Sequence, residues 1–207
     1  MRHIRSPKWI RAEQAGEVVV DSRRAVLVWP DGQVVPRYVF PSEDVRLAEG
    51  VHECGDPELA GHVLVDWNGP DRWLEEDEEV VGHPRDPFHR IDILQSSRHV
   101  VVELDGQAYA ESRRPVLLFE TGLPVRAYLP REDVRLDLLE PSDGRTTCAY
   151  KGHASYFSAP DHPNIAWTYE EPLREAERVR GLIAFFDERS DVTVDGERQE
   201  RPRTQWS

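Results

Sequence analysis

The chain has 207 residues, of which 39% are hydrophobic and 31% charged, so it can bury a core and keep a charged surface. Its formal charge of −13 argues against nonspecific binding to nucleic acid or to anionic membranes, because both attract positive charge. No apolar run is long enough for a signal peptide or a transmembrane helix. We therefore expect a cytoplasmic protein with no nucleic-acid or membrane partner, in which Cys54 and Cys148 stay free thiols.

Two parts of the sequence contain similar segments in the same order. "GEVVVDSRRAVLVW" begins at Gly16 and "GQAYAESRRPVLLF" at Gly106. Next, "PRYVFPSEDVRL" from Pro36 matches "VRAYLPREDVRL" from Val125. Further on, the Gly-His pair at 61–62 aligns with the pair at 152–153, and Trp73 aligns with Trp167. Such internal similarity predicts two copies of one structural module.

We place the first module at residues 1–88 and the second at residues 89–207. The modules are connected by "EEDEEVVGHPRDPFHR" from Glu75, which is acidic and then rich in proline and histidine, as is typical of a linker on the surface. An alternative is that this run continues the first module. Two copies in one chain favour a monomer with internal pseudo-symmetry or a weak homodimer.

Short strands dominate the predicted structure of both modules. Segments such as "EVVVDS", "AVLVWP", "HVVVEL" and "PVLLFE" are rich in β-branched and aromatic residues. "LDGQ" and "VDGE" contain Asp-Gly, which favours hairpin turns. The shared "SRR" predicts one turn geometry in both copies. The second module also contains one predicted α-helix, at about 172–188, because Pro172 suits a first helical turn and apolar residues recur every three or four positions.

Lysine is rare in this chain. Lysine and arginine together number 26, yet Lys8 and Lys151 are the only lysines. A chain so biased towards arginine has a lysine where a primary amine has a specific use, as a ligand for a carboxylate or phosphate, a general base, or an imine-forming group. The alternative is a structural role, in which Lys151 pairs with an acid such as Glu140 to hold a loop.

The two aligned copies differ in their polar residues. At an offset of 91, the second copy has polar or reactive side chains where the first has Pro57, Leu59, Ala60 and Val65; these are Cys148, Tyr150, Lys151 and Tyr156. Tyr128 aligns with Val39, and Tyr38 is one position away, on the opposite face of a strand. We therefore assign the candidate site to the second module.

The segment "RAYLPREDVRLDLLEPSDGRTTCAYKGHASYF", followed by "IAWTY", resembles the family called domain of unknown function 427. The resemblance covers the second copy and, more weakly, the first. It implies a mainly β fold of tandem β-tent modules, in which small antiparallel sheets meet at an angle, and a pocket without an established activity. Ala149 departs from the proline expected after the cysteine. We expect neither a cofactor nor a metal site, since no CxxC pair is present.

Eight residues form the candidate site. Lys151, Tyr128 and Tyr156 are the candidate catalytic residues, and the candidate ligand-binding residues are Arg126, Cys148, Tyr150, Trp167 and Tyr169. Each tyrosine could equally pack in a sheet, and Cys148 is more often a small buried thiol than a nucleophile. His153 has a counterpart in His62, which favours a structural role.

Two functions fit this reading. The first is a pocket for a small molecule in the second module, with or without a catalysed reaction. The second is a non-catalytic module that holds a peptide end or a modified side chain. A third, nucleotidyl transfer, lacks the glycine-rich phosphate loop and the paired metal-binding carboxylates that such chemistry uses.

Overall fold

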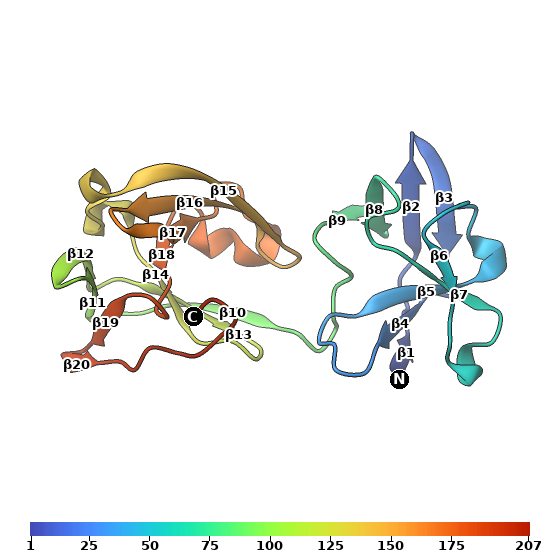
Figure 1. Cartoon of the computed structure of the whole chain (residues 1–207), viewed down its shortest axis with the longest axis horizontal. Coiled ribbons are helices and arrows are strands. Elements are labelled where there is room, and N and C mark those ends of the chain that lie inside the picture. The colour runs from blue at the N-terminus through green and yellow to red at the C-terminus, as the bar shows by residue number, and fades with distance from the viewer. The chain divides into compact units, whose positions relative to one another are not determined.

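The computed structural model describes all 207 residues, and the chain divides into two compact units, Met1–Pro87 and Phe88–Ser207. Both units are built from short antiparallel strands (Figure 1), which confirms the mainly β prediction. The helices are short 3-10 helices: η1 to η5 span Ser42–Asp44, Pro57–Leu59, Arg131–Asp133, Leu136–Leu138 and Arg174–Val179. None of them has the length and apolar character needed to cross a membrane.

The first unit consists of two sheets. One has the order β1-β4-β5-β7-β6, with strands Arg2–Arg5, Val26–Trp29, Arg37–Pro41, His62–Val65 and Val51–Glu53. The other has the order β3-β2-β8-β9, with strands Glu17–Ser22, Ile10–Gln14, Arg72–Glu75 and Glu78–Val80. The acidic run that we predicted as a linker therefore forms the β8–β9 hairpin and belongs to this unit.

The second unit consists of three sheets. The order β12-β11-β19-β20 joins Gln107–Ser112, Val100–Leu104, Asp191–Val194 and Glu197–Arg198. The order β10-β13-β14 joins Ile91–Gln95, Val116–Glu120 and Arg126–Tyr128. The order β15-β16-β17-β18 joins Glu140–Cys148, Gly152–Ala159, His162–Thr168 and Ile183–Phe185, and the long β15–β16 hairpin is prominent in Figure 1. One core of 25 buried apolar residues holds the sheets together.

The repeated "SRR" forms the same turn in both units, as predicted. The Ser22 hydroxyl accepts a hydrogen bond from the Arg24 backbone N–H (3.0 Å) and donates to the Asp44 carboxylate (2.7 Å). Ser112 makes the same two bonds, to the Arg114 N–H (3.1 Å) and to Asp133 (2.7 Å). Each arginine side chain also binds its aspartate, so these shared residues fix the exit from a strand.

The hairpin signals are also confirmed. Asp105 and Gly106 have φ of 50° and 81° and join β11 to β12, and Asp195 and Gly196, with φ of 53° and 86°, join β19 to β20. Two successive residues at positive φ match the right-handed twist of the flanking strands. Aspartate and glycine are residues that tolerate this conformation.

Strand pairing overturns the alignment of the later segments. Ala12 pairs with Trp73, and the corresponding Val102 pairs with Val192, so the counterpart of Trp73 is Val192 and not Trp167. Likewise β7 pairs with β5 in the first unit, whereas in the second a bridge from Leu129 to Ile183 places β18 next to β14. The Gly-His pairs are therefore not equivalent.

The second unit consequently contains an insertion. The offset between equivalent residues is 90 for Ala12 and Val102 and 119 for Trp73 and Val192, a difference of 29 residues. The extra length lies in the segment between β14 and β18, where the second unit has β15, β16, β17 and the 3-10 helix η5 and the first unit has the shorter β6 and η2. The polar residues Cys148 to Tyr156 lie in this longer segment.

The predicted helix is shorter and of a different type. In place of an α-helix at 172–188, the chain forms the 3-10 helix η5 and then strand β18. Ala176 and Val179 are fully buried, and their spacing of three matches the three residues per turn of a 3-10 helix. Gly181, at φ 68°, ends the helix and turns the chain so that Ile183 can pair with Thr168.

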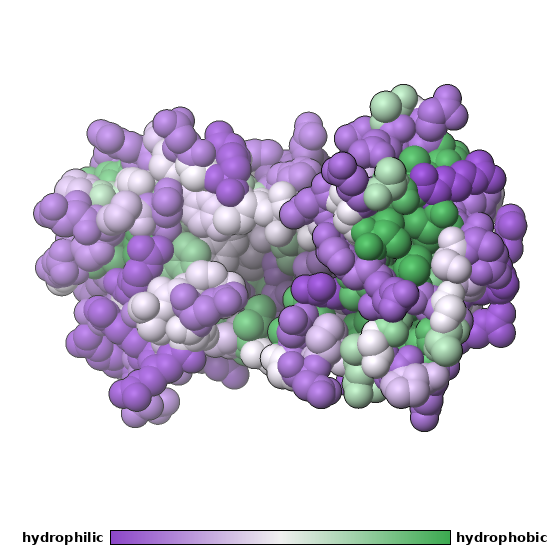
Figure 2. All heavy atoms as spheres, turned by 45° about the vertical axis from the view of Figure 1, so that its right-hand side comes forward, coloured by the Kyte–Doolittle hydropathy of each residue, from purple (hydrophilic) through white to green (hydrophobic).

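The visible surface is mostly hydrophilic, with a hydrophobic area on the first unit at the right of Figure 2. Nine large apolar side chains are exposed along the chain. Five of them belong to the second unit: Phe88, Leu94, Phe119, Leu123 and Val125.

Candidate functional site

Lys151 lies in the turn between β15 and β16, and its side chain is buried. The residue is 8% exposed, and its Nζ donates to Oε2 of Glu120 at the end of β13. Two backbone contacts hold the turn: the Lys151 carbonyl accepts from the Leu173 N–H (3.1 Å), and Gly152 bridges to Pro172. Gly152 has φ of 94°, so the alternation of side chains along a strand does not govern where Lys151 points.

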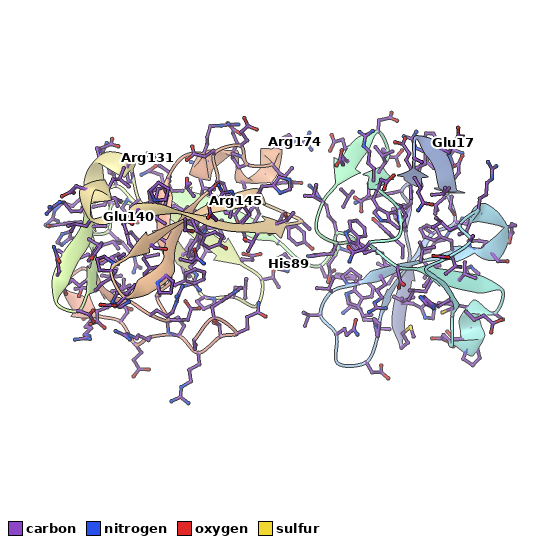
Figure 3. All side chains as sticks on the ribbon, turned by 45° about the horizontal axis from the view of Figure 1, so that its top comes forward. Glu17, His89, Arg131, Glu140, Arg145 and Arg174 are labelled. Atoms are coloured by element: carbon purple, nitrogen blue, oxygen red, sulfur yellow. The ribbon has the colours of Figure 1, made fainter.

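Glu120 links Lys151 to a histidine that we had not assigned to the site. His89 Nε2 lies 3.0 Å from Glu120 Oε1, and both side chains are largely buried. The His89 ring stacks on Tyr150, with centroids 4.3 Å apart. Figure 3 labels His89, which lies at the start of the second unit, and Glu140, the first residue of β15. The partner of Lys151 is therefore Glu120, not Glu140.

A carboxylate with an ammonium on one oxygen and an imidazole on the other forms a short chain of ionisable groups. Charges taken out of water need close partners, because burial of an isolated charge costs several kcal/mol. Glu120 and Lys151 supply each other with that partner. The arrangement can bind an anion through the remaining ammonium donors, or pass a proton between the amine and the imidazole through the carboxylate.

Tyr128 and Trp167 pack against each other in the core of the second unit. Tyr128 is 1% exposed, and its hydroxyl accepts a hydrogen bond from Trp167 Nε1 (3.1 Å). The two rings meet edge to face, and the Tyr169 ring lies 6.5 Å from Tyr128. Burial raises the pKa of both tyrosines far above the ordinary value. Both phenols stay protonated at neutral pH, so they act as hydrogen-bond donors and not as bases.

Tyr156 lies on a different part of the insertion. It pairs with Trp167 across β16 and β17, and its ring stacks on Phe186 with centroids 6.3 Å apart. Its hydroxyl bonds to Thr146 (2.7 Å) on the exposed side of the hairpin. Tyr156 therefore supports the sheet next to the site, and its phenol is engaged away from Lys151.

Arg126 already holds two carboxylates. Its guanidinium donates to Glu188 (2.5 Å) and lies 3.3 Å from Asp187. Burial raises the pKa of Asp187 to about 6, although Arg126 opposes the shift. Burial also acts to raise the pKa of Glu188, but hydrogen bonds from Arg126 and Thr204 outweigh it and hold that pKa below its ordinary value. The clamp predicted for a ligand anion is thus occupied by the protein's own acids.

The remaining candidates have plain roles. Cys148 is a free, half-buried thiol at the end of β15, and Cys54 is also free. His153 is exposed and bonds to Thr147 (2.9 Å) on the neighbouring strand, which fits the structural role expected of it. No cluster of three or more histidine, cysteine, aspartate or glutamate side chains is placed to hold a metal.

Sequence reasoning missed Glu120, His89, Asp187 and Glu188. The sequence held one signal for Glu120, which is its position at the end of the apolar strand "PVLLFE". A carboxylate there lies next to the core and needs either a partner or access to water. His89 lies in the segment that we predicted as a linker. Asp187 and Glu188 lie at the end of the predicted helix, in a part of the chain that is not helical.

The family assignment rests on the sequence of the second unit. The family described as domain of unknown function 427 has a sequence model that matches residues 92–196, just over half of the chain. The match covers β10 to the turn after β19, including the insertion with Lys151. No curated protein matches the chain. On the extent of this match, the chain belongs to the domain of unknown function 427 family.

Proposed function

We propose that the second unit binds a small molecule that carries a carboxylate or phosphate, at a site centred on Lys151. The observation that supports it is the buried chain Lys151–Glu120–His89. An ammonium has three donors, and the pair with Glu120 uses one of them. A ligand anion can approach the other two, while Tyr128 and Trp167 supply an apolar wall that excludes water.

A reaction at this site would use the same residues. The phenols of Tyr128 and Tyr169 stay protonated, so proton transfer falls to Lys151, Glu120 and His89. Binding without reaction is the simpler alternative and needs only the ammonium. Incubation of the protein with each ligand found in a thermal-shift screen, followed by mass spectrometry, separates the two: product formation supports an enzyme, and an unchanged ligand supports a binding module.

The test of the site is Lys151→Arg. Arginine keeps the charge, but its planar guanidinium cannot take the place of a compact amine against Glu120. We expect a ligand that raises the melting temperature of the wild type to lose most of that effect in K151R. Lys8→Arg in the first unit is the matched control and should leave the ligand effect intact. Equal ligand shifts in K151R and the wild type would refute the role of the amine.

We also infer that the first unit is a shortened copy of the same module, without the insertion. The repeated Ser-Arg-Asp turns, the matched Asp-Gly or Ala-Gly hairpins and the parallel strand registers support this. The first unit then serves as a structural or regulatory partner of the second. We expect a cytoplasmic protein that works as a monomer, which the acidic charge and free thiols support.

A further inference from the structure

The second unit contains a cavity of about 380 Å³ that does not involve Lys151. It lies among strands β11, β13, β14, β18 and β19, with the segment before the C-terminus along one side. Its apolar lining includes Val102, Leu117, Ala127, Phe185 and Val192. A volume of this size falls in the range that binds small molecules.

The first unit fills the corresponding space with its own aromatic side chains. Leu27 pairs with Tyr38 in β4–β5, and the equivalent Leu117 pairs with Ala127 in β13–β14, so alanine replaces Tyr38. The register of β8 and β19 shows in the same way that Val192 replaces Trp73.

The two replaced aromatic residues form part of one packed group. Tyr38 and Trp73 are 2% and 3% exposed, and their ring centroids lie 5.5 Å apart. Trp67 stacks on Trp73 with centroids 5.2 Å apart. Alanine and valine in these places leave the volume of two ring systems unfilled, because the surrounding strands keep the same pairing.

Asp187 is one of the polar residues of the lining, together with Arg98, Ser190, Gln199 and Glu200. Asp187 lines the cavity, and its carboxylate lies 3.3 Å from Nη1 of Arg126. In the first unit the Tyr38 hydroxyl donates a 2.5 Å hydrogen bond to the carboxylate of Glu75. A buried phenol against a buried carboxylate is therefore a combination that this chain already uses once.

The cavity has an apolar rim. Phe119 and Val125 line it and are 40% and 44% exposed, although large apolar side chains of this kind usually lie inside a protein. Arg98 and Glu200 are the charged side chains of the lining other than Asp187, and they carry opposite signs. The walls therefore favour an uncharged aromatic molecule over a small ion.

We propose that this cavity binds a small aromatic molecule with one O–H or N–H donor, of the phenol or indole class. The ring occupies the space that Tyr38 and Trp73 fill in the first unit, among Val102, Ala127 and Val192. The donor bonds to the carboxylate of Asp187. This site is separate from the Lys151 site, and the two proposals stand or fall independently.

The experiment is an NMR titration of the full-length, isotope-labelled chain with 4-methylphenol, indole and toluene. We expect 4-methylphenol and indole to shift the backbone amide signals around Ala127, Asp187 and Val192, with dissociation constants of about 1 mM or below. Toluene, which lacks the donor, should bind about tenfold more weakly. Shifts confined to the surroundings of Lys151, or no shifts at all, would overturn the proposal.

Three variants test the details. Val192→Trp restores the side chain of the first unit and should abolish binding of all three molecules. Leu94→Trp adds the same indole on an exposed strand position and should leave binding unchanged. Asp187→Ala should weaken 4-methylphenol about tenfold and leave toluene bound as before. Equal binding of 4-methylphenol by wild type and D187A would overturn the hydrogen bond even if V192W fails to fold.

Discussion

The two units differ in the burial of their lysines and in how the space between their sheets is filled. Each lysine of the chain pairs with a buried glutamate, Lys8 with Glu75 and Lys151 with Glu120. In the first unit the lysine side chain is 42% exposed, whereas Lys151 is 10% exposed. The first unit fills its space between the sheets with aromatic rings, and the second leaves a cavity there. The comparison shows that the two units share their turns and differ in the burial of the lysine and in which space between the sheets is filled.

The largest expected effect comes from opening the filled unit. Trp73→Ala should lower the free energy of unfolding of the first unit by about 4 kcal/mol, because it removes a buried indole and leaves a cavity. Val192→Ala at the equivalent place already borders a cavity and should cost about 1 kcal/mol. Urea unfolding followed by NMR, with signals assigned to each unit, measures both separately. Similar costs would show that the two spaces are packed alike.

Breaking the ion pairs comes next. Lys151→Met should destabilise the second unit by about 3 kcal/mol, because Glu120 remains buried and loses its ammonium. Lys8→Met should destabilise the first unit by about 1 kcal/mol, since water can reach Glu75 in place of the half-exposed lysine. Adding Glu120→Gln to K151M should restore part of the loss. A larger cost for K8M than for K151M would contradict the ranking by burial.

The pH dependence of Asp187 gives a smaller effect of defined sign. Its pKa is raised to about 6 by burial, so the folded protein binds this proton more tightly than the unfolded chain. The ionised carboxylate therefore destabilises the fold above pH 6, and this cost disappears as the pH falls towards the ordinary value.

Asp187→Asn should accordingly stabilise the second unit by about 2 kcal/mol at pH 7.5. The difference from the wild type should shrink to near zero by about pH 4, because the protonated acid resembles the amide. Urea unfolding across this pH range checks it. A D187N variant less stable than the wild type at pH 7.5 would mean that the ion pair with Arg126 outweighs the desolvation of Asp187.

The smallest effect tests what the units share. Ser22→Ala and Ser112→Ala should each cost about 1 to 2 kcal/mol in their own unit, because both remove a buried hydroxyl that bridges a backbone N–H and an aspartate. Ser96→Ala, at a half-buried serine whose hydroxyl accepts from the Arg98 N–H, is the control and should cost less. Clearly unequal losses for Ser22 and Ser112 would argue against a common turn.

Local chemistry could be predicted because each signal needs only neighbouring residues. The Asp-Gly hairpins and the Ser-Arg turns follow from the backbone angles and short hydrogen bonds that those side chains allow. The type and length of the predicted helix were wrong because apolar spacings of three fit both an α-helix and a 3-10 helix. The end of the helix is set by a long-range contact, the pairing of β18 with β17.

The sequence by itself determined the mainly β fold and the turns common to both units, and it singled out Lys151 as a candidate because lysine is rare in this chain. Only the tertiary structure decided that Glu120 and His89 accompany Lys151, that Lys151 lies in a segment that is longer in the second unit, and that Trp73 corresponds to Val192. Periodicity and turn chemistry act over a few residues, whereas ion pairs, cavities and strand registers join residues tens of positions apart. Those long-range contacts are chosen by the packing of the whole unit.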